Sequence, residues 1–412
     1  MVVRAPVLTL LLVILLGAVG VAKEPPQTPR QQVAVEVIRA FRESNHARVA
    51  ELASQPVPDP WGVAETLCHQ EEWAAARAFA KATTGLATET LAAYVRGREG
   101  TQPDAAAWDA LGKLEAALTG KQWDVALQIA APFEDDLDTV LRIEIRFRRA
   151  WALKHSQKLT KAAAAFESAA RGAQVLGWRA AVLAGLKEAG GCAWDQHDYA
   201  TAFGLWDEGA AAARQLGALG EAATLLDLAG RAAMIQGRTS RALDVLTRRV
   251  EVLGSVPGAQ MLPDALLSLG DLHLQLADFD QARKCFKKAE RRAAKAQPAQ
   301  PLMAAQARLG LGNVDRNEGN FEDARAHIEH ALSVFREYGA EEQEASALSA
   351  RAVLHELQGA YARSFRDHRA VFAIATTSRF PQTRAPKLNN LGNLEMRLGD
   401  LGRAQDHYAE AH

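Results

Sequence analysis

The sequence is poor in several of the residues on which small functional sites depend. Among 412 residues there are three cysteines, and aromatic residues make up 6%. Three cysteines (Cys68, Cys192 and Cys285) cannot build a disulfide framework. Neither sign of charge is in excess, because 48 Lys and Arg stand against 49 Asp and Glu. This balance argues against a nucleic acid or an acidic membrane as partner, since both require an excess of positive charge on one face.

Recognisable catalytic motifs are also missing. The sequence has no G-x-S-x-G, Walker P-loop or G-x-G-x-x-G motif. We therefore expect no catalytic residues and no cofactor, and predict that the protein is not an enzyme. His327 and His330 share a helical face and could bind a metal together, but the sequence indicates no third ligand at a fitting distance. No metal site is predicted.

Helix-forming residues are abundant. Hydrophobic residues make up 48% and charged residues 24%, which is the balance of a globular protein. Ala, Leu, Arg and Glu dominate, and these residues favour helices, so an all-α fold is predicted. The same Ala- and Arg-rich composition is typical of a bacterial protein from a GC-rich genome.

The N-terminus has the pattern of a signal peptide. Residues 1–22 combine Arg4, an apolar run from Val7 to Leu16, and small residues at Gly20 and Ala22. We expect export to the periplasm or the extracellular space, with an uncleaved N-terminal membrane anchor and a buried helix as alternatives. Residues 23–30 are Pro-rich and polar, which predicts a short linker.

The body of the chain repeats about every 40 residues. Small residues that anchor a first helix fall at positions 150, 190, 230, 270, 312, 352 and 392. A second set of mostly small residues follows 12 positions later, at 162, 202, 242, 282, 324, 364 and 404. A fixed period of this size indicates a solenoid of stacked units.

Each unit is predicted to be a helical hairpin. Small residues let two helices approach closely, and larger side chains fill the space between them. A glycine before the second helix, as at Gly237, Gly319, Gly359 and Gly399, suits a left-handed residue that ends the first helix. In the unit around Ala352, Ser364 and His368 occupy key positions, so we expect weaker packing there.

The pattern resembles the tetratricopeptide repeat family. The resemblance rests on pairs such as Leu391-Gly392, followed by a small residue at Ala404, an aromatic residue at Tyr408 and a small residue at Ala411. It covers about 145–412 clearly and implies a right-handed α-solenoid of stacked antiparallel hairpins. Repeats of the HEAT type have a similar length but lack this spacing.

The predicted domains are the signal peptide 1–22, the linker 23–30, a divergent helical cap at 31–100 and the repeat array at 101–412. Within the cap, residues 33–53 are expected to form one amphipathic helix, which must end before the prolines of 55–60.

The resemblance also implies a binding groove lined by the first helix of each hairpin. Amide, carboxylate and guanidinium groups on that face could bind a peptide backbone or clamp a carboxylate. The candidate groove residues are Asp227, Arg231, Asp271, Gln275, Asn313, Arg316, Asn317, Asn389, Asn393 and Arg397.

Three functions are compatible with this reading. The first is an exported, non-enzymatic scaffold that binds a protein or peptide segment in the groove. The second is the recognition arm of a caspase-like (CHAT-type) peptidase, because long-period repeats of this family often precede such a domain. The third is an envelope assembly or oligomerisation module. The sequence stops inside a second helix at His412, so self-association through an uncapped end, or a truncated reading, is also expected.

Overall fold

The computed structural model describes residues 29–43, 45–54, 60–70, 72–82, 95, 105–133, 140–377, 388–389, 392–393, 395–396 and 399–411. The predicted signal peptide and the candidate groove residue Arg397 lie outside these residues. The chain divides into two compact units, Met1–Val245 (unit 1) and Leu246–His412 (unit 2).

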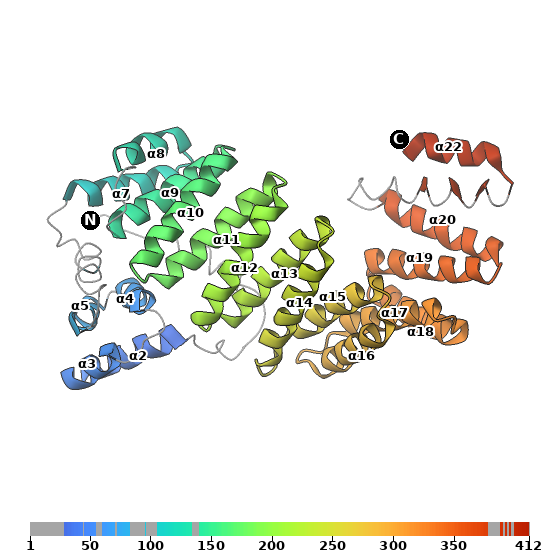
Figure 1. Cartoon of the computed structure of the whole chain (residues 1–412), viewed down its shortest axis with the longest axis horizontal. Helices are drawn as coiled ribbons and strands as arrows, with labels where there is room; N and C mark the ends of the chain where they lie inside the picture. The colour runs from blue at the N-terminus through green and yellow to red at the C-terminus, as the bar shows by residue number, and fades with distance from the viewer. Residues whose placement is uncertain are drawn as a thin grey trace. The chain divides into compact units, whose positions relative to one another are not determined.

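The described residues are almost entirely helical, which confirms the all-α prediction (Figure 1). The helices of unit 1 are α2 (Pro29–Arg42), α3 (His46–Ser54), α4 (Pro60–His69), α5 (Trp73–Ala82), α7 (Ala105–Thr119), α8 (Trp123–Ala130), the 3₁₀ turn η1 (Ala131–Phe133), α9 (Val140–His155), α10 (Leu159–Val175), α11 (Arg179–Asp195), α12 (Tyr199–Gln215) and α13 (Leu219–Ile235). Helix α14 (Thr239–Gly254) contains the boundary. The helices of unit 2 are α15 (Leu262–Gln275), α16 (Phe279–Lys295), α17 (Pro301–Asn317), α18 (Phe321–Glu337), α19 (Glu341–Leu357), α20 (Tyr361–Thr377) and α22 (Leu401–Ala411).

Consecutive helices pack against one another within each unit. In unit 1 the series runs from α9 to α13, and in unit 2 it runs from α15 to α20 (Figure 1). In unit 2 the first helices of successive hairpins also touch, because α17 contacts both α15 and α19. The hairpins are therefore stacked, as the repeat period predicts.

The turns inside the hairpins keep the predicted register. Gly237, Gly319, Gly359 and Gly399 have φ of 66°, 83°, 73° and 84°, in the left-handed region that glycine adopts without steric cost. The equivalent turns of three other hairpins place a residue with a side chain in the same region, at Gln157, His197 and Ala277. The backbone conformation is thus a property of the repeat, and glycine is only the easiest residue for it.

Close approach between helices depends on the anchor glycines. A Cβ atom at Gly190 would lie 2.5 Å from Nε1 of Trp206, and one at Gly270 would lie 2.7 Å from Cε1 of Phe286. The same Phe286 ring would be 2.5 Å from a Cβ at Gly310. An aromatic residue of the second helix therefore occupies the volume that glycines on neighbouring first helices leave free.

The N-terminal helices differ from the single helix expected at 33–53. The structure has α2 and α3 there, separated near Asn45. The Asn45 side chain accepts a hydrogen bond of 3.0 Å from the backbone N–H of Arg48, which is an N-cap for α3. A local cap thus interrupts a pattern that is amphipathic throughout. Residues from α2 to α5, such as Val37, Leu67 and Phe79, share one apolar core with Phe166 and Leu186 of the first hairpins.

No helix among the described residues is long and apolar enough to span a bilayer.

Candidate functional site

The candidate groove residues that are described lie on or next to the first helices of the hairpins. Asp227 and Arg231 are on α13, Asp271 and Gln275 on α15, and three others on α17: Asn313, Arg316 and Asn317. Because α15 and α17 are in contact, five of the candidates of unit 2 lie on adjacent helices. Their surroundings differ, and this separates groups that are already satisfied from groups that are not.

In unit 1 the two candidates bind each other. Arg231 Nη2 lies 2.7 Å from Asp227 Oδ2, one helical turn away, and Asp227 is 9% exposed. The carboxylate is therefore neutralised inside its own helix. These two residues offer little to a ligand unless that ion pair is broken.

Asp271 in unit 2 has no such partner among the described residues. Its side chain is exposed to solvent, yet the protein surrounding it raises the pKa of its carboxyl group to about 6 through desolvation. Gln275, one turn further along α15, is exposed.

Asn313 and Arg316 also have few partners within the protein. Asn313 Oδ1 is buried and accepts no hydrogen bond from the described residues. Arg316 is half-buried, and desolvation lowers the pKa of its guanidinium, with no carboxylate near enough to oppose the shift. Its Nη2 donates a long hydrogen bond of 3.5 Å to Asn317 Oδ1. A buried acceptor without a protein partner can be satisfied by water or by a ligand, which makes Asn313 Oδ1 a candidate ligand contact.

The last pair of described candidates is solvent-exposed. Asn389 and Asn393 both present exposed side chains, and Asn393 Oδ1 accepts a hydrogen bond of 2.7 Å from the Tyr408 hydroxyl. Arg397 was predicted beside them and is not described.

Sequence reasoning missed a pocket in unit 1. It has a volume of about 370 Å³ and lies on first helices α9 and α11 and the start of α13, where Phe147, Trp151, Leu183 and Leu216 supply apolar walls. Two ion pairs lie at this pocket: Lys154 with Glu188 at 2.7 Å, and Lys187 with Glu221 at 3.0 Å. Trp151 follows its anchor Ala150 directly, as Asp271 follows Gly270. The expectation that the residue after each anchor faces the groove, extended two units upstream, would have identified Trp151.

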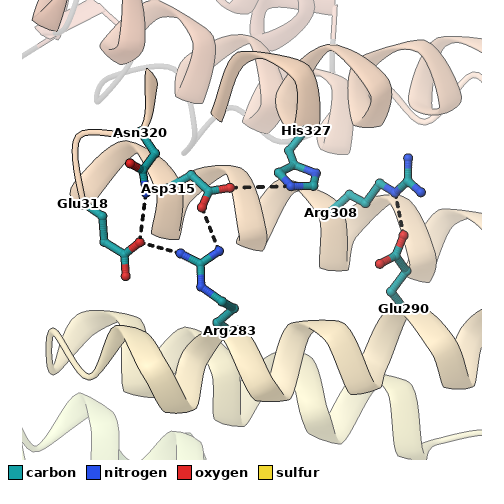
Figure 2. Close-up of polar contacts among 7 residues, drawn as sticks. All are labelled: Arg283, Glu290, Arg308, Asp315, Glu318, Asn320 and His327. Carbon is teal, nitrogen blue, oxygen red and sulfur yellow. Dashed lines mark hydrogen bonds and ion pairs between the residues drawn. The ribbon is translucent and has the colours of Figure 1, made fainter. Parts of the chain in front are cut away.

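One of the two histidines considered as metal ligands, His327, has a protein partner. His327 Nε2 lies 3.5 Å from Asp315 Oδ2, and Arg283 donates to the other oxygen of Asp315 at 2.7 Å (Figure 2). Within the described residues no cluster of three or more His, Cys, Asp or Glu could hold a metal ion.

The thiols of Cys192 and Cys285 are not activated nucleophiles. Burial raises the pKa of Cys192 to about 11, and burial also raises the pKa of Cys285. Both cysteines therefore remain protonated at neutral pH, where a thiolate would be needed for catalysis.

Comparison with known proteins agrees with this architecture. A family model described as the tetratricopeptide repeat matches residues 263–295, which include most of α15 and all of α16. The apo form of RapI has 12% sequence identity and a TM-score of 0.49, covering 74% of this chain and 96% of that one. Aspartyl phosphate phosphatase F from Bacillus subtilis has 13% identity and a TM-score of 0.46, covering 75% and 94%. A tetratricopeptide repeat protein from Parabacteroides merdae has 16% identity and a TM-score of 0.42, covering 74% and 92%.

No curated protein matches the sequence. The tetratricopeptide repeats expected from the sequence are confirmed by the family match at 263–295 and by hairpins of the same register on either side of it.

Proposed function

We propose that the chain is a non-enzymatic scaffold that binds a protein or peptide segment along the first helices of its hairpins. The observation that carries this proposal is a set of polar side chains on adjacent helices α15 and α17 that lack a charged partner among the described residues. These are the desolvated carboxylate of Asp271, the unpaired carbonyl oxygen of Asn313 and the half-buried guanidinium of Arg316.

An extended peptide supplies the partners that these groups lack. Its backbone N–H groups can donate to Asn313 Oδ1 and to Asp271, and its carbonyl oxygens or a carboxylate can accept from Arg316. Groups that are already desolvated in the free protein lose little hydration when the peptide arrives, so the new hydrogen bonds contribute more to the affinity.

Export to the periplasm or the extracellular space is part of the proposal and rests on the sequence of residues 1–22 alone. The peptidase-arm and assembly functions stay as alternatives.

The test uses the full chain and peptides selected on it from a random displayed library. We expect the double substitution Asn313→Ala with Arg316→Ala to weaken the selected peptides by about tenfold or more, because hydrogen bonds to charged groups contribute about 1.5–3 kcal/mol. Fluorescence anisotropy gives the dissociation constants, and circular dichroism checks that helicity is kept.

The matched control replaces Lys161 and Arg214, which are exposed on second helices α10 and α12, with Ala. It should bind the selected peptides as the parent does. If the Asn313 and Arg316 variant also keeps the parental affinity, the peptides bind elsewhere and the assignment is wrong.

A further inference from the structure

Helix α16 carries a concentration of positive charge that the whole-chain balance conceals. Among its 17 residues are seven Lys and Arg and two Asp and Glu, which gives 7 − 2 = +5. The whole chain has a net charge of −1, so the residues outside α16 sum to −6. The helix is therefore locally basic within a chain that is acidic elsewhere.

The side of α16 that packs on α17 is neutralised internally. Arg283 extends from α16 to Asp315 and Glu318, and Glu290 extends to Arg308 (Figure 2). Glu290 and Arg283, which is one of the seven cations, therefore already have partners within the protein. The buried face of the same helix is apolar and consists of Ala282, Phe286, Ala289 and Ala293.

The other six cations form one helical face. They recur at helical spacing, all six are exposed, and none has a carboxylate partner among the described residues. We call this surface the basic face of α16; it consists of Lys284, Lys287, Lys288, Arg291, Arg292 and Lys295. At 1.5 Å per residue the row is about 17 Å long.

Like charges one turn apart destabilise a helix, so this arrangement opposes the stability of α16. An anionic partner would remove the repulsion. We propose that the basic face of α16 is a docking surface for an acidic polypeptide segment of a partner protein, with Asp or Glu at helical or alternating spacing. This surface is separate from the groove candidates and does not depend on them.

The character of the face favours a polypeptide over the other common polyanions. No large hydrophobic side chain is exposed along α16, so nothing there would insert into a bilayer. No exposed aromatic residue is available to stack on nucleic acid bases. A broad polyanion would also meet the net negative charge of the remaining chain, whereas a short acidic segment contacts the cations alone.

The test uses the full chain and a fluorescent peptide of about twelve residues in which Glu recurs at helical spacing. The variant Lys284→Glu with Lys288→Glu and Arg291→Glu reverses the centre of the face and keeps good helix formers. The control variant reverses Lys161, Arg214 and Arg369, three exposed cations on other helices, so that both variants change the net charge equally.

We expect the parent to bind the peptide and to lose at least about tenfold in affinity between about 50 mM and 300 mM NaCl, because salt screens exposed charges. At low salt the α16 variant should bind the peptide with about tenfold or more lower affinity than the parent, and the control variant with less than about twofold lower affinity. Circular dichroism should show equal helicity in all three proteins.

Two results would overturn the proposal. Equal losses in the two variants would mean that net charge, and not this face, governs binding. Tighter α16-dependent binding to phosphatidylglycerol vesicles or to duplex DNA than to the acidic peptide would assign the face to a membrane or a nucleic acid.

Discussion

The two units use one hairpin template with different chemistry at one pair of positions. One member of the pair lies three residues after the anchor of the first helix. The other lies three residues after the small residue of the second helix. In unit 1 the pairs are apolar and buried: Leu153 with Ala165, Ala193 with Leu205, and Ala233 with Val245. In unit 2 they are polar: His273 with Cys285, Asp315 with His327, His355 with Asp367, and Glu395 with His407.

The polar pairs of unit 2 hold together through additional partners. Asp367 accepts two hydrogen bonds from Arg351, of 2.9 and 2.7 Å, with His355 at 3.9 Å. His407 Nδ1 lies 2.6 Å from Glu395 Oε2, although Glu395 is only 2% exposed. The repeat therefore tolerates charge inside a hairpin when a neighbouring side chain neutralises it.

The unit around Ala352 shows the same compensation. Ser364 and His368, at which weaker packing was expected, are both buried, and each lies within hydrogen-bonding distance of Glu356 Oε1, at 3.0 and 3.2 Å. Hydrogen bonds replace the apolar contacts that the template uses elsewhere. The comparison shows that the template requires close helix approach and an apolar core in both units, but an apolar pair at these positions in only one.

The largest expected effect tests what the units share. Gly190→Leu in unit 1 and Gly270→Leu in unit 2 should each lower the free energy of unfolding by about 3 kcal/mol or more, because each side chain would overlap an aromatic ring. Urea denaturation measures the loss. Gly191→Ala is the control, since a Cβ there meets nothing within 4 Å. A tolerated leucine at either anchor would show that the register is wrong.

The next effect tests where the units differ. Asp315→Ala should cost about 2 kcal/mol, because it leaves His327 and part of the Arg283 charge without a partner. Adding His327→Leu reproduces the Ala193 and Leu205 pair of unit 1 at these positions. Most of the lost free energy of unfolding should then be recovered. Thermal and urea unfolding of both variants provide the measurement. A double variant as unstable as the single one would contradict the idea that the two pair chemistries are interchangeable.

The smallest effect concerns the first-helix acids, Asp227 in unit 1 and Asp271 in unit 2. The pKa of Asp271 is raised in the folded protein to about 6, so its charge opposes folding above that pH and the penalty fades as the pH falls toward 3.8, the ordinary pKa of an aspartate. Asp271→Asn should therefore increase stability slightly at pH 8, by well under about 1 kcal/mol because the group is exposed, with no gain at pH 4. Urea midpoints at both pH values provide the measurement.

Asp227→Asn is the matched control, because it removes a carboxylate that Arg231 neutralises. It should lower stability at pH 8, which is the opposite sign. A gain of the same size in both variants would contradict the distinction between a paired and an unpaired acid.

The sequence by itself determined the period, the hairpin and its turn. Each follows from residues close together in the chain, such as Gly399 at the turn with its φ of 84° and Gly270 at the helix contact, so a repeating pattern is enough to find them. Only the tertiary structure decided which polar residues are free. Asp227 and Arg316 were both predicted to line the groove, but one is neutralised by Arg231 and the other meets no carboxylate. The same holds for charge, because a net value of −1 does not reveal six unpaired cations on one face of α16. Pairing depends on what neighbouring helices place within a few ångströms, and neither composition nor period contains that distance.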